Sequence, residues 1–293
     1  MPAILKIITA TIIWGSLGVF VRHIHIPSLE AAFLRSFIAV AFLSLIFLFL
    51  KEKKLNGLRE NISVLMLSGA LIGFNWVLLF QAYRYTTIAN ATLTYYLSPV
   101  LIVLLAPLIG EKMSANKIIA VLGGMTGLSI IISQQALVTN SSYQHGVGIA
   151  YGLVAAMSYA GVVLLNKKIK NIDGFQITIV QLATASLVLL PFYIARNNFY
   201  VPQGDIIFIL ILGLVHTGLA FLLYLTGLKE LKAQSVALLS YLDPISAVLF
   251  GILLLNEPMT LWQMLGGLLI LGSAYYGTKE KKSADAQITK PAS

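Results

Sequence analysis

The chain of 293 residues has no cysteine, only eleven acidic residues and only four histidines. The missing cysteines exclude disulfide bonds and every metal or redox site that depends on a thiolate. Charged residues make up 11% of the chain, whereas soluble domains carry about 25%, so an ordinary soluble fold is also excluded. No phosphate-binding loop of the type GxxxxGK[ST] occurs, so the chain does not itself hydrolyse a nucleotide through that motif.

Long apolar runs stand where the charges are missing. Hydrophobic residues make up 58% of the chain. Charge-free runs of at least 21 residues cover residues 61–83, 85–110, 174–195, 206–228 and 258–278, and a longer one at 118–166 is divided into two spans by its polar middle. A helix needs about 20 apolar residues to cross a bilayer, and a helical backbone satisfies its own hydrogen bonds in lipid. The runs therefore predict an all-α integral membrane protein.

The predicted crossings number ten. They lie near residues 4–22, 29–50, 61–83, 87–109, 115–133, 147–166, 174–195, 205–228, 233–255 and 260–278. Sixteen of the twenty lysines and arginines fall on the side of the N-terminus, three fall on the other side, and Arg35 lies within a span. Because positive residues favour the cytoplasmic side, this alternation predicts a multi-pass protein of the cytoplasmic membrane with both termini in the cytoplasm.

The second half of the chain repeats the first. The segment 91–112 is similar to the segment 236–258, and within them YLSP at 96–99 aligns with YLDP at 241–244. Each unit has five spans, an odd number, so the second unit enters the membrane in the opposite direction to the first. The predicted fold is thus ten transmembrane helices as two inverted five-helix repeats. Inverted repeats are a common transporter plan, with the substrate site at their interface near the middle of the bilayer.

Several short motifs occur in a characteristic order. They are IIWGSLGVFVR at 12–22, FLRSFIA at 33–39, the two YLxP segments, two glutamates that end spans four and nine, and two spans with Leu-Gly-Gly. On these motifs the whole chain resembles an EamA-type member of the drug/metabolite transporter superfamily. The resemblance implies alternating access and transport of small metabolites such as amino acids, commonly outward. It does not single out one substrate, because the family is broad.

The repeat divides the chain into four parts. We expect the first EamA-like repeat at residues 4–133 and the second at 147–278, with a polar external loop at 134–146 between them. A basic, disordered cytoplasmic tail is expected at 279–293. The net charge of +9 lies in short loops beside helix ends, where it meets anionic lipid. The predicted partner is therefore the lipid bilayer and not a nucleic acid.

Arg35 is a candidate substrate-binding residue because of its depth. It lies about six residues into the second span, roughly 9 Å below the outer boundary at 1.5 Å per residue. A charge at such depth usually faces a cavity, and a guanidinium suits a carboxylate or phosphate. The alternative is a structural arginine that bonds backbone carbonyls or extends to the boundary. Its counterpart in the second repeat is Gln181, so the two halves differ chemically here.

Acidic residues occur beside a proline in the ninth span and at the ends of spans four and nine. Asp243 precedes Pro244 in the ninth span, where proline leaves a carbonyl without its amide partner and often kinks the helix. We interpret Asp243 as a candidate proton carrier that would couple transport to a gradient; the alternative is a capping role near the boundary. Glu111 and Glu257 end spans four and nine, and we predict a structural role for them: they cap the helices that follow or stabilise the N-terminal dipoles of those helices. Direct contact with a substrate is the alternative.

Polar and aromatic residues inside the spans are the other candidates for a substrate cavity. Thr87, Asn90, Thr94 and Ser98 share one helical face of the fourth span. A polar stripe in hydrocarbon should face protein or water, although serine and threonine also bond across packed helices. No second metal-ligating residue accompanies the eighth-span histidine at metal spacing, so no metal site is predicted. The full set of cavity candidates is Trp14, Arg35, Asn75, Tyr83, Asn90, Thr94, Ser98, Tyr159, His216, Tyr224 and Tyr241.

These features predict a secondary transporter, not an enzyme, that moves small metabolites and needs no cofactor. Its predicted partners are a small-molecule substrate, lipid and, as a candidate coupling ion, the proton. Two alternatives stay open. The span count does not separate a transporter from a passive facilitator or channel. An integral-membrane enzyme acting on a lipid-linked substrate would need clustered acids, histidines or metal ligands, whereas the eleven acids here are scattered.

Overall fold

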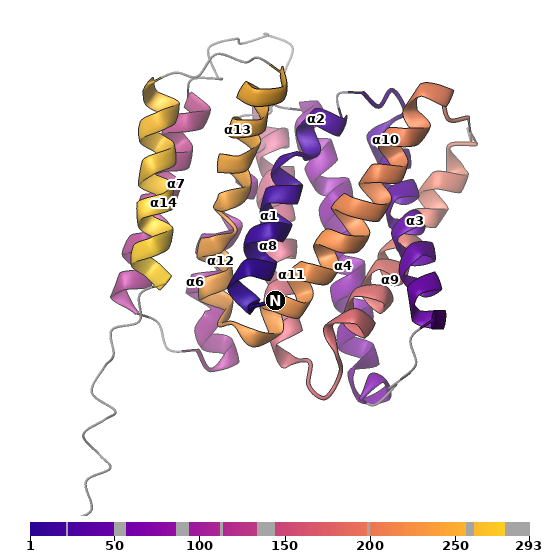
Figure 1. Ribbon diagram of the computed structural model, residues 1–293, viewed down its shortest axis with the longest axis horizontal. Helices are drawn as coiled ribbons and strands as arrows, with labels where there is room; N and C mark the ends of the chain where they lie inside the picture. Colours follow the sequence, from indigo (N-terminus) through magenta and orange to yellow (C-terminus); the bar gives the residue numbers. More distant parts are fainter. Residues whose placement is uncertain are drawn as a thin grey trace, which may run out of the picture.

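The computed structural model describes residues 1–21, 23–49, 57–85, 94–111, 114–133, 144–197, 200–255 and 261–278. Within these residues the regular structure is helical throughout, and no strand occurs among them. The helices form one bundle, in which α7 and α14 stand side by side at one edge (Figure 1). The predicted tail at 279–293 lies outside the described residues. So does the predicted external loop up to residue 143, after which α8 begins at His145.

The first half of the chain contributes five spans, two of which are interrupted. Span one is divided into two helices at Ser16, and in span four a short 3-10 helix, η1, continues α6. The elements are α1 (Ala3–Gly15), α2 (Leu17–Val21), α3 (Ser28–Phe49), α4 (Leu58–Tyr85), α6 (Ser98–Leu105), η1 (Ala106–Ile109) and α7 (Ala115–Ser133).

The second half has the same plan with different interruptions. Span eight begins with a 3-10 turn and contains a π-helix, and span nine is divided into two helices. The elements are α8 (His145–Lys168), α9 (Gly174–Ala195), η2 (Gln203–Asp205), α10 (Ile206–Ile211), the π-helix η3 (Leu212–Leu219), α11 (Ala220–Glu230), α12 (Ala233–Leu239), α13 (Leu242–Leu255) and α14 (Leu261–Thr278).

Length and composition suit a membrane. Five helical stretches are long and apolar enough to cross one: Leu29–Phe49, Leu58–Leu79, Gly146–Lys168, Gly174–Ala195 and Gln203–Glu230. Four shorter apolar stretches belong to spans one, four, five and ten, and the ninth span is shared between α12 and α13. Large apolar side chains are exposed on the outside of the bundle, as lipid contact requires. The predicted all-α membrane fold, with ten crossings in two halves, is confirmed.

Packing between the helices follows the sequence repeat. In the first half α4 packs against α8 and α9; its counterpart in the second half, formed by η3 and α11, packs against α3 and α1. In the same way α6 contacts α8, and α13 contacts α1. Each of these interfaces joins one half of the chain to the other. The hydrophobic core is therefore shared by the two repeats and does not belong to either alone.

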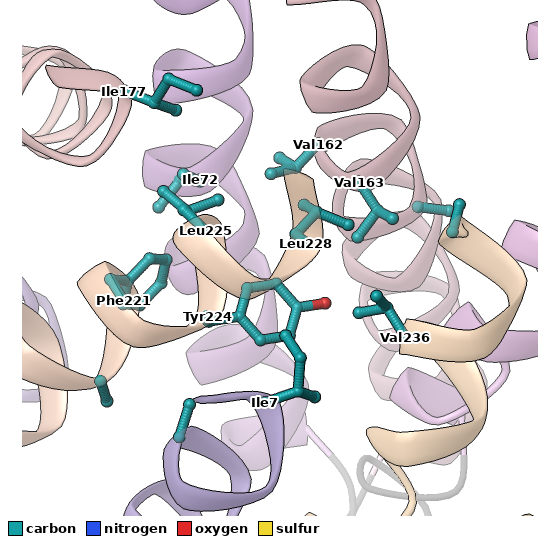
Figure 2. Packing of buried hydrophobic residues seen from close by; sticks show 14 of the residues in the cluster. Ile7, Ile72, Val162, Val163, Ile177, Phe221, Tyr224, Leu225, Leu228 and Val236 are labelled. Carbon is teal, nitrogen blue, oxygen red and sulfur yellow. The ribbon is translucent and has the colours of Figure 1, made fainter. Parts of the chain in front are cut away.

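The main core is an apolar cluster drawn from both halves. Side chains of α1, α4, α8, α9, α11 and α12 meet in it, and Figure 2 shows Ile7, Leu228 and Val236 near the ring of Tyr224. A second, smaller cluster lies toward α7 and α14 and contains Leu128, Tyr241 and Ile270. The pair α7 and α14 thus has its own core beside the main one.

Glycines allow several of these helices to approach closely. A Cβ atom on Gly69 of α4 would lie 2.7 Å from the carbonyl oxygen of Gln181 in α9. A Cβ atom on Gly127 of α7 would lie 2.5 Å from the carbonyl oxygen of Gly266 in α14. Both glycines therefore serve close packing of helices within the bundle.

Polar side chains tie each hairpin of one half to a helix of the other. The buried carboxylate of Asp205 accepts hydrogen bonds from the backbone amides of His25, at 2.6 Å, and Ile26, at 3.2 Å. At the matching position of the other repeat, the Asn61 side chain accepts one from the amide of Lys170 at 3.2 Å. The two contacts hold the turn between spans one and two, and the turn between spans six and seven.

Glu111 caps a helix, but not the one that follows it. Its carboxylate accepts hydrogen bonds from the amides of Ala233, at 2.8 Å, and Gln234, at 3.4 Å, which begin α12 in the other half. The prediction of a cap on the next helix was made from distance along the chain. The fold instead brings the ninth span to the end of the fourth, and α12 has no side-chain cap of its own at Lys232. Glu257 lies outside the described residues.

Candidate functional site

The fourth and ninth spans are interrupted at matching positions of the repeat. In span four a turn at Tyr96 and Leu97 precedes α6, and in span nine a turn at Ser240 and Tyr241 separates α12 from α13. Proline lies in the first turn after each break and cannot supply an amide to the backbone ladder. Discontinuous helices of this kind expose backbone groups within the membrane, and transporters commonly use them to bind substrates.

Aromatic rings from five spans meet beside these breaks. The Trp14 ring lies 5.1 Å from Phe221 and 5.0 Å from Tyr224, measured between ring centroids. The Tyr159 hydroxyl donates a 2.6 Å hydrogen bond to the Tyr224 hydroxyl. Trp76 contacts Phe221 at 5.8 Å, and Tyr95 contacts Tyr159 at 5.9 Å. We call this group the central aromatic cluster: Trp14, Trp76, Tyr95, Tyr159, Phe221 and Tyr224.

Arg35 lies at one end of the central aromatic cluster. Its guanidinium carbon is 4.4 Å from the centroid of the Trp76 ring, a cation–π contact, and the side chain is only 6% exposed. The Nε–H has no hydrogen-bond partner among the described residues. A buried donor without a partner is costly, and an acceptor supplied by a ligand would remove that cost.

The counterpart of Arg35 is engaged quite differently. Gln181 donates hydrogen bonds to the Ser68 hydroxyl and, at 3.0 Å, to the Asn166 side chain. These contacts join α4, α8 and α9 through polar groups that are all buried. The two repeats therefore place a packing glutamine and a cation at equivalent positions, as the chemical difference between the two residues suggested.

Asp243 lies at the other end of the cluster. It occupies the first turn of α13, is partly buried, and forms a side-chain hydrogen bond with Tyr96. The Tyr96 ring contacts Tyr95 at 5.8 Å, and Tyr95 belongs to the central aromatic cluster. An uninterrupted series of ring contacts thus connects Arg35 in span two with Asp243 in span nine. A cation and an acid separated by aromatic rings can recognise a small solute that carries charge and apolar surface.

His216 is buried next to the cluster and is held from span one. Its Nε2 atom lies 2.9 Å from the Ser16 hydroxyl, and its backbone carbonyl accepts a 2.8 Å hydrogen bond from the Trp14 indole. The imidazole also contacts the Phe20 ring at 4.8 Å. Among the described residues there is no group of three or more side chains able to hold a metal ion.

The remaining candidates from the sequence lie in other places. Asn75 donates a 2.7 Å hydrogen bond to the Ala155 carbonyl and so joins α4 to α8. Tyr241 is 1% exposed and packs on Gly124 of α7, in the smaller core. Thr94 and Ser98 are buried on either side of the break in span four. The side chain of Tyr83 and the whole of Asn90 lie outside the described residues.

The structure therefore brings together about half of the candidate set. Asp243 is connected to the central aromatic cluster through Tyr96, which the candidate set did not contain. Five members of the set lie in the cluster or in contact with it: Trp14, Arg35, Tyr159, His216 and Tyr224. The set also lacked Tyr95 and Phe221. For Phe221 a signal existed, since it precedes Tyr224 by three residues and so shares its helical face.

Comparisons with known proteins agree with a transport role. The model of the EamA-like transporter family matches residues 1–133 and 146–276. The uncharacterized transporter YxxF of Bacillus subtilis (strain 168) is 28% identical over 270 residues, covering 92% of this chain and 86% of that protein. An uncharacterized transporter of Archaeoglobus fulgidus is 29% identical over 276 residues, covering 94% and 95%. A protein of known crystal structure, 20% identical, has the same fold with a TM-score of 0.80 over 94% of this chain and 97% of that one.

Proposed function

The chain belongs to the EamA-like transporter family, and on that premise we propose that it is a secondary transporter of small metabolites. The proposed substrates are amino acids or related compounds with a carboxylate, exported across the cytoplasmic membrane. Both termini lie on the cytoplasmic side in this proposal, because the lysines and arginines of the short loops gather there. The observation that carries the proposal is the buried, incompletely bonded Arg35 beside the central aromatic cluster.

Arg35 is proposed as the anchor for the substrate carboxylate. Its planar guanidinium offers donors in a fixed geometry that matches a carboxylate, and the Nε–H has no partner among the described residues to compete. Trp76 covers one face of the guanidinium, which reduces the cost of holding a charge at this depth. The other rings of the cluster would contact the apolar part of the substrate.

Asp243 is proposed as the proton carrier. It lies at a helix break, and its hydrogen bond to Tyr96 links it to the same cluster that would hold the substrate. A carboxyl group that gains and loses a proton there would change the charge of the site during each cycle. Only the second repeat has an acid at this position, because the first repeat has Ser98 there.

Alternating access is supported by the pairing of helices between the halves. The packing of α4 against α8 and α9 has an equivalent in the packing of η3 and α11 against α3 and α1. The two repeats can therefore exchange their arrangements without forming new kinds of interface. Such an exchange would expose the site first on one side of the membrane and then on the other. We propose this as the transport mechanism.

The test is uptake into proteoliposomes of labelled amino acids and related metabolites, with and without a pH gradient. We expect saturable transport and counterflow of solutes that carry a carboxylate. Arg35→Ala should lower the apparent kcat/KM at least tenfold, about 1.4 kcal/mol, and Arg35→Lys should restore only part of it. Asp243→Asn should retain counterflow but lose the response to the gradient.

Each contrary result has a distinct meaning. Wild-type transport in both variants would reject the roles of Arg35 and Asp243 while leaving the transporter intact. Uptake without saturation or counterflow would indicate a passive facilitator. No flux of any solute, from protein whose thermal unfolding is that of a folded chain, would contradict the transporter proposal for this panel.

A further inference from the structure

Span eight contains a stretch of π-helix that its counterpart lacks. The stretch is η3, Leu212–Leu219, whereas α4 runs as an uninterrupted α-helix from Leu58 to Tyr85. Span one is broken at Ser16, directly against η3, whereas its counterpart α8 is unbroken from His145 to Lys168. π-Helices are rare, accommodate an extra residue within an α-helix, and occur frequently at functional sites. One irregular element from each half, the break in span one and the π-helix of span eight, thus meet in one interface.

Side chains hold this π-helix by bonding its carbonyl groups. The Thr217 hydroxyl donates a 2.8 Å hydrogen bond to the Leu212 carbonyl. The Nδ1 atom of His216 lies 3.4 Å from the carbonyl of Ile211, the residue before η3. The Trp14 indole, from span one, donates a hydrogen bond to the His216 carbonyl. These three side-chain contacts add to the backbone hydrogen bonds of η3 and of the adjoining residue Ile211, and so favour the π-helical geometry.

Span two rests on the same stretch of π-helix. A Cβ atom on Gly213 would lie 2.5 Å from Ile38 and 3.2 Å from the backbone oxygen of Arg35. A Cβ atom on Gly218 would lie 3.2 Å from the Phe42 ring. The backbone that carries Arg35 is therefore in direct contact with η3. A change in the geometry of η3 would therefore act on Arg35 in span two and on Phe221 and Tyr224, which follow η3 in span eight.

We propose that η3 holds one residue more than an α-helix would, and that spans one and eight use it as a register switch. When Trp14 releases the His216 carbonyl, η3 returns to α geometry and α11 turns by about 100° and shifts by about 1.5 Å, one residue of helix. Phe221 and Tyr224 leave the central aromatic cluster, and the site opens beside span eight. Trp14 and His216 are thus positioning residues, and α4 and α8 form the part that stays rigid.

This inference rests on the proposed function, because the switch is assigned to the transport cycle. Its test does not need a substrate. Deletion of Val215, within η3 and 36% exposed, should remove the extra residue and leave the helix register on both sides unchanged. The matched control is deletion of Ala70, inside the regular helix α4, which should displace every residue beyond it.

We expect the Val215 deletion to yield folded protein that unfolds within a few degrees of the wild type, and the Ala70 deletion to yield little or none. Equal damage by the two deletions would overturn the idea of an extra residue. So would an Ala70 deletion that is tolerated as well as the Val215 deletion, because the two helices would then not differ in register.

The switch itself is tested by distances between spin labels. The chain has no native cysteine, so Lys168→Cys on α8 and Glu230→Cys at the end of α11 can be labelled without background. Trp14→Phe keeps a ring but removes the N–H bond to His216, and a second distance should appear, displaced by up to about 8 Å for a 100° turn. In Trp14→Phe with Val215 deleted, the second distance should be absent.

An unchanged distance distribution in Trp14→Phe would overturn the switch, as would a second distance that persists after the deletion. The flux assay separates this failure from failure of the proposed function. A working transporter whose distances never change has no such switch. Distances that change as expected, in a protein with no flux for any solute, keep the switch but remove its assignment to transport.

Discussion

A close approach between α4 and α9 at Gly69 allows a sharp test of the packing. Gly69→Ala places a Cβ atom 2.7 Å from the Thr184 Cβ and 2.7 Å from the Gln181 carbonyl oxygen. One turn later on the same helix, a Cβ atom on Gly73 would lie 3.3 Å from the Ala185 carbonyl oxygen and no nearer to any other atom. The two glycines therefore differ in the space around them, although they face the same helix.

The size of the effect follows from these distances. Carbon atoms pack best at about 3.5–4.0 Å, so the methyl group at position 69 falls short by about 0.8 Å and the helices must separate. Overpacking of this kind costs about 1–3 kcal/mol. At about 2–4 °C per kcal/mol for a chain of this order of size, Gly69→Ala should lower the Tm by about 2–12 °C. The methyl group of Gly73→Ala falls short of ordinary contact with the Ala185 carbonyl oxygen by only about 0.2 Å, so this variant should lower the Tm by less than Gly69→Ala does.

Thermal unfolding in detergent, followed by intrinsic tryptophan fluorescence, measures both variants. Gly272→Ala in α14 is a second control, because nothing lies within 4 Å of the added methyl group. If Gly73→Ala or Gly272→Ala lowers the Tm as much as Gly69→Ala, steric contact with α9 is not the cause. If Gly69→Ala unfolds as the wild type does, the close crossing of α4 and α9 is wrong.

Three further substitutions test individual polar contacts by the same measurement. Asp205→Ala leaves the amide of His25 without its acceptor and should cost about 1–3 kcal/mol. Asn75→Leu removes the donor to the Ala155 carbonyl within the membrane and should cost a similar amount, with no change in substrate preference. Glu111→Ala should lower the Tm by removing the cap of α12, typically about 1 kcal/mol, and an unchanged Tm in any of the three would reject that contact's contribution.

The crossings were predictable because charged residues fix their ends. The seventh span was expected at 174–195, and α9 runs from Gly174 to Ala195. Asp173 caps its first turn by accepting a hydrogen bond from the Gln176 amide at 2.9 Å, and Arg196 follows its last residue. A polar residue at a membrane boundary is both a hydropathy signal and a helix end, so the two kinds of evidence coincide there.

The interruptions inside the spans were only partly predictable. The two YLxP segments mark the breaks in spans four and nine, because proline restricts the backbone before it. Nothing in the apolar sequence of span eight signals η3, whose carbonyls are satisfied in part by Trp14, far away along the chain. A π-helix held by a tertiary contact leaves hydropathy unchanged, so only the assembled bundle shows it.

Two of the cavity candidates lie away from the central aromatic cluster for a related reason. Tyr241 occupies the break between α12 and α13, and the turn directs its ring onto Gly124 instead of along the face of either helix. Asn75 shares the depth of the cluster residues, but its amide finds the Ala155 carbonyl across the α4–α8 interface. Depth and polarity identify side chains that need a partner. They do not tell whether the partner is a substrate or a neighbouring helix.

Differences between the repeats indicate where function is concentrated. If the two halves served packing alone, matching positions would carry interchangeable residues, as the paired helix contacts do. Instead, the position of the cation Arg35 is occupied in the other repeat by Gln181, whose amide nitrogen is hydrogen-bonded, and the position of the acid Asp243 is occupied by Ser98. The π-helix containing His216 likewise stands opposite a regular α-helix. Each departure lies on the helices that surround one aromatic cluster. Two similar halves whose differences gather at one place suit the proposed substrate site, because a solute bound between them need not share their similarity.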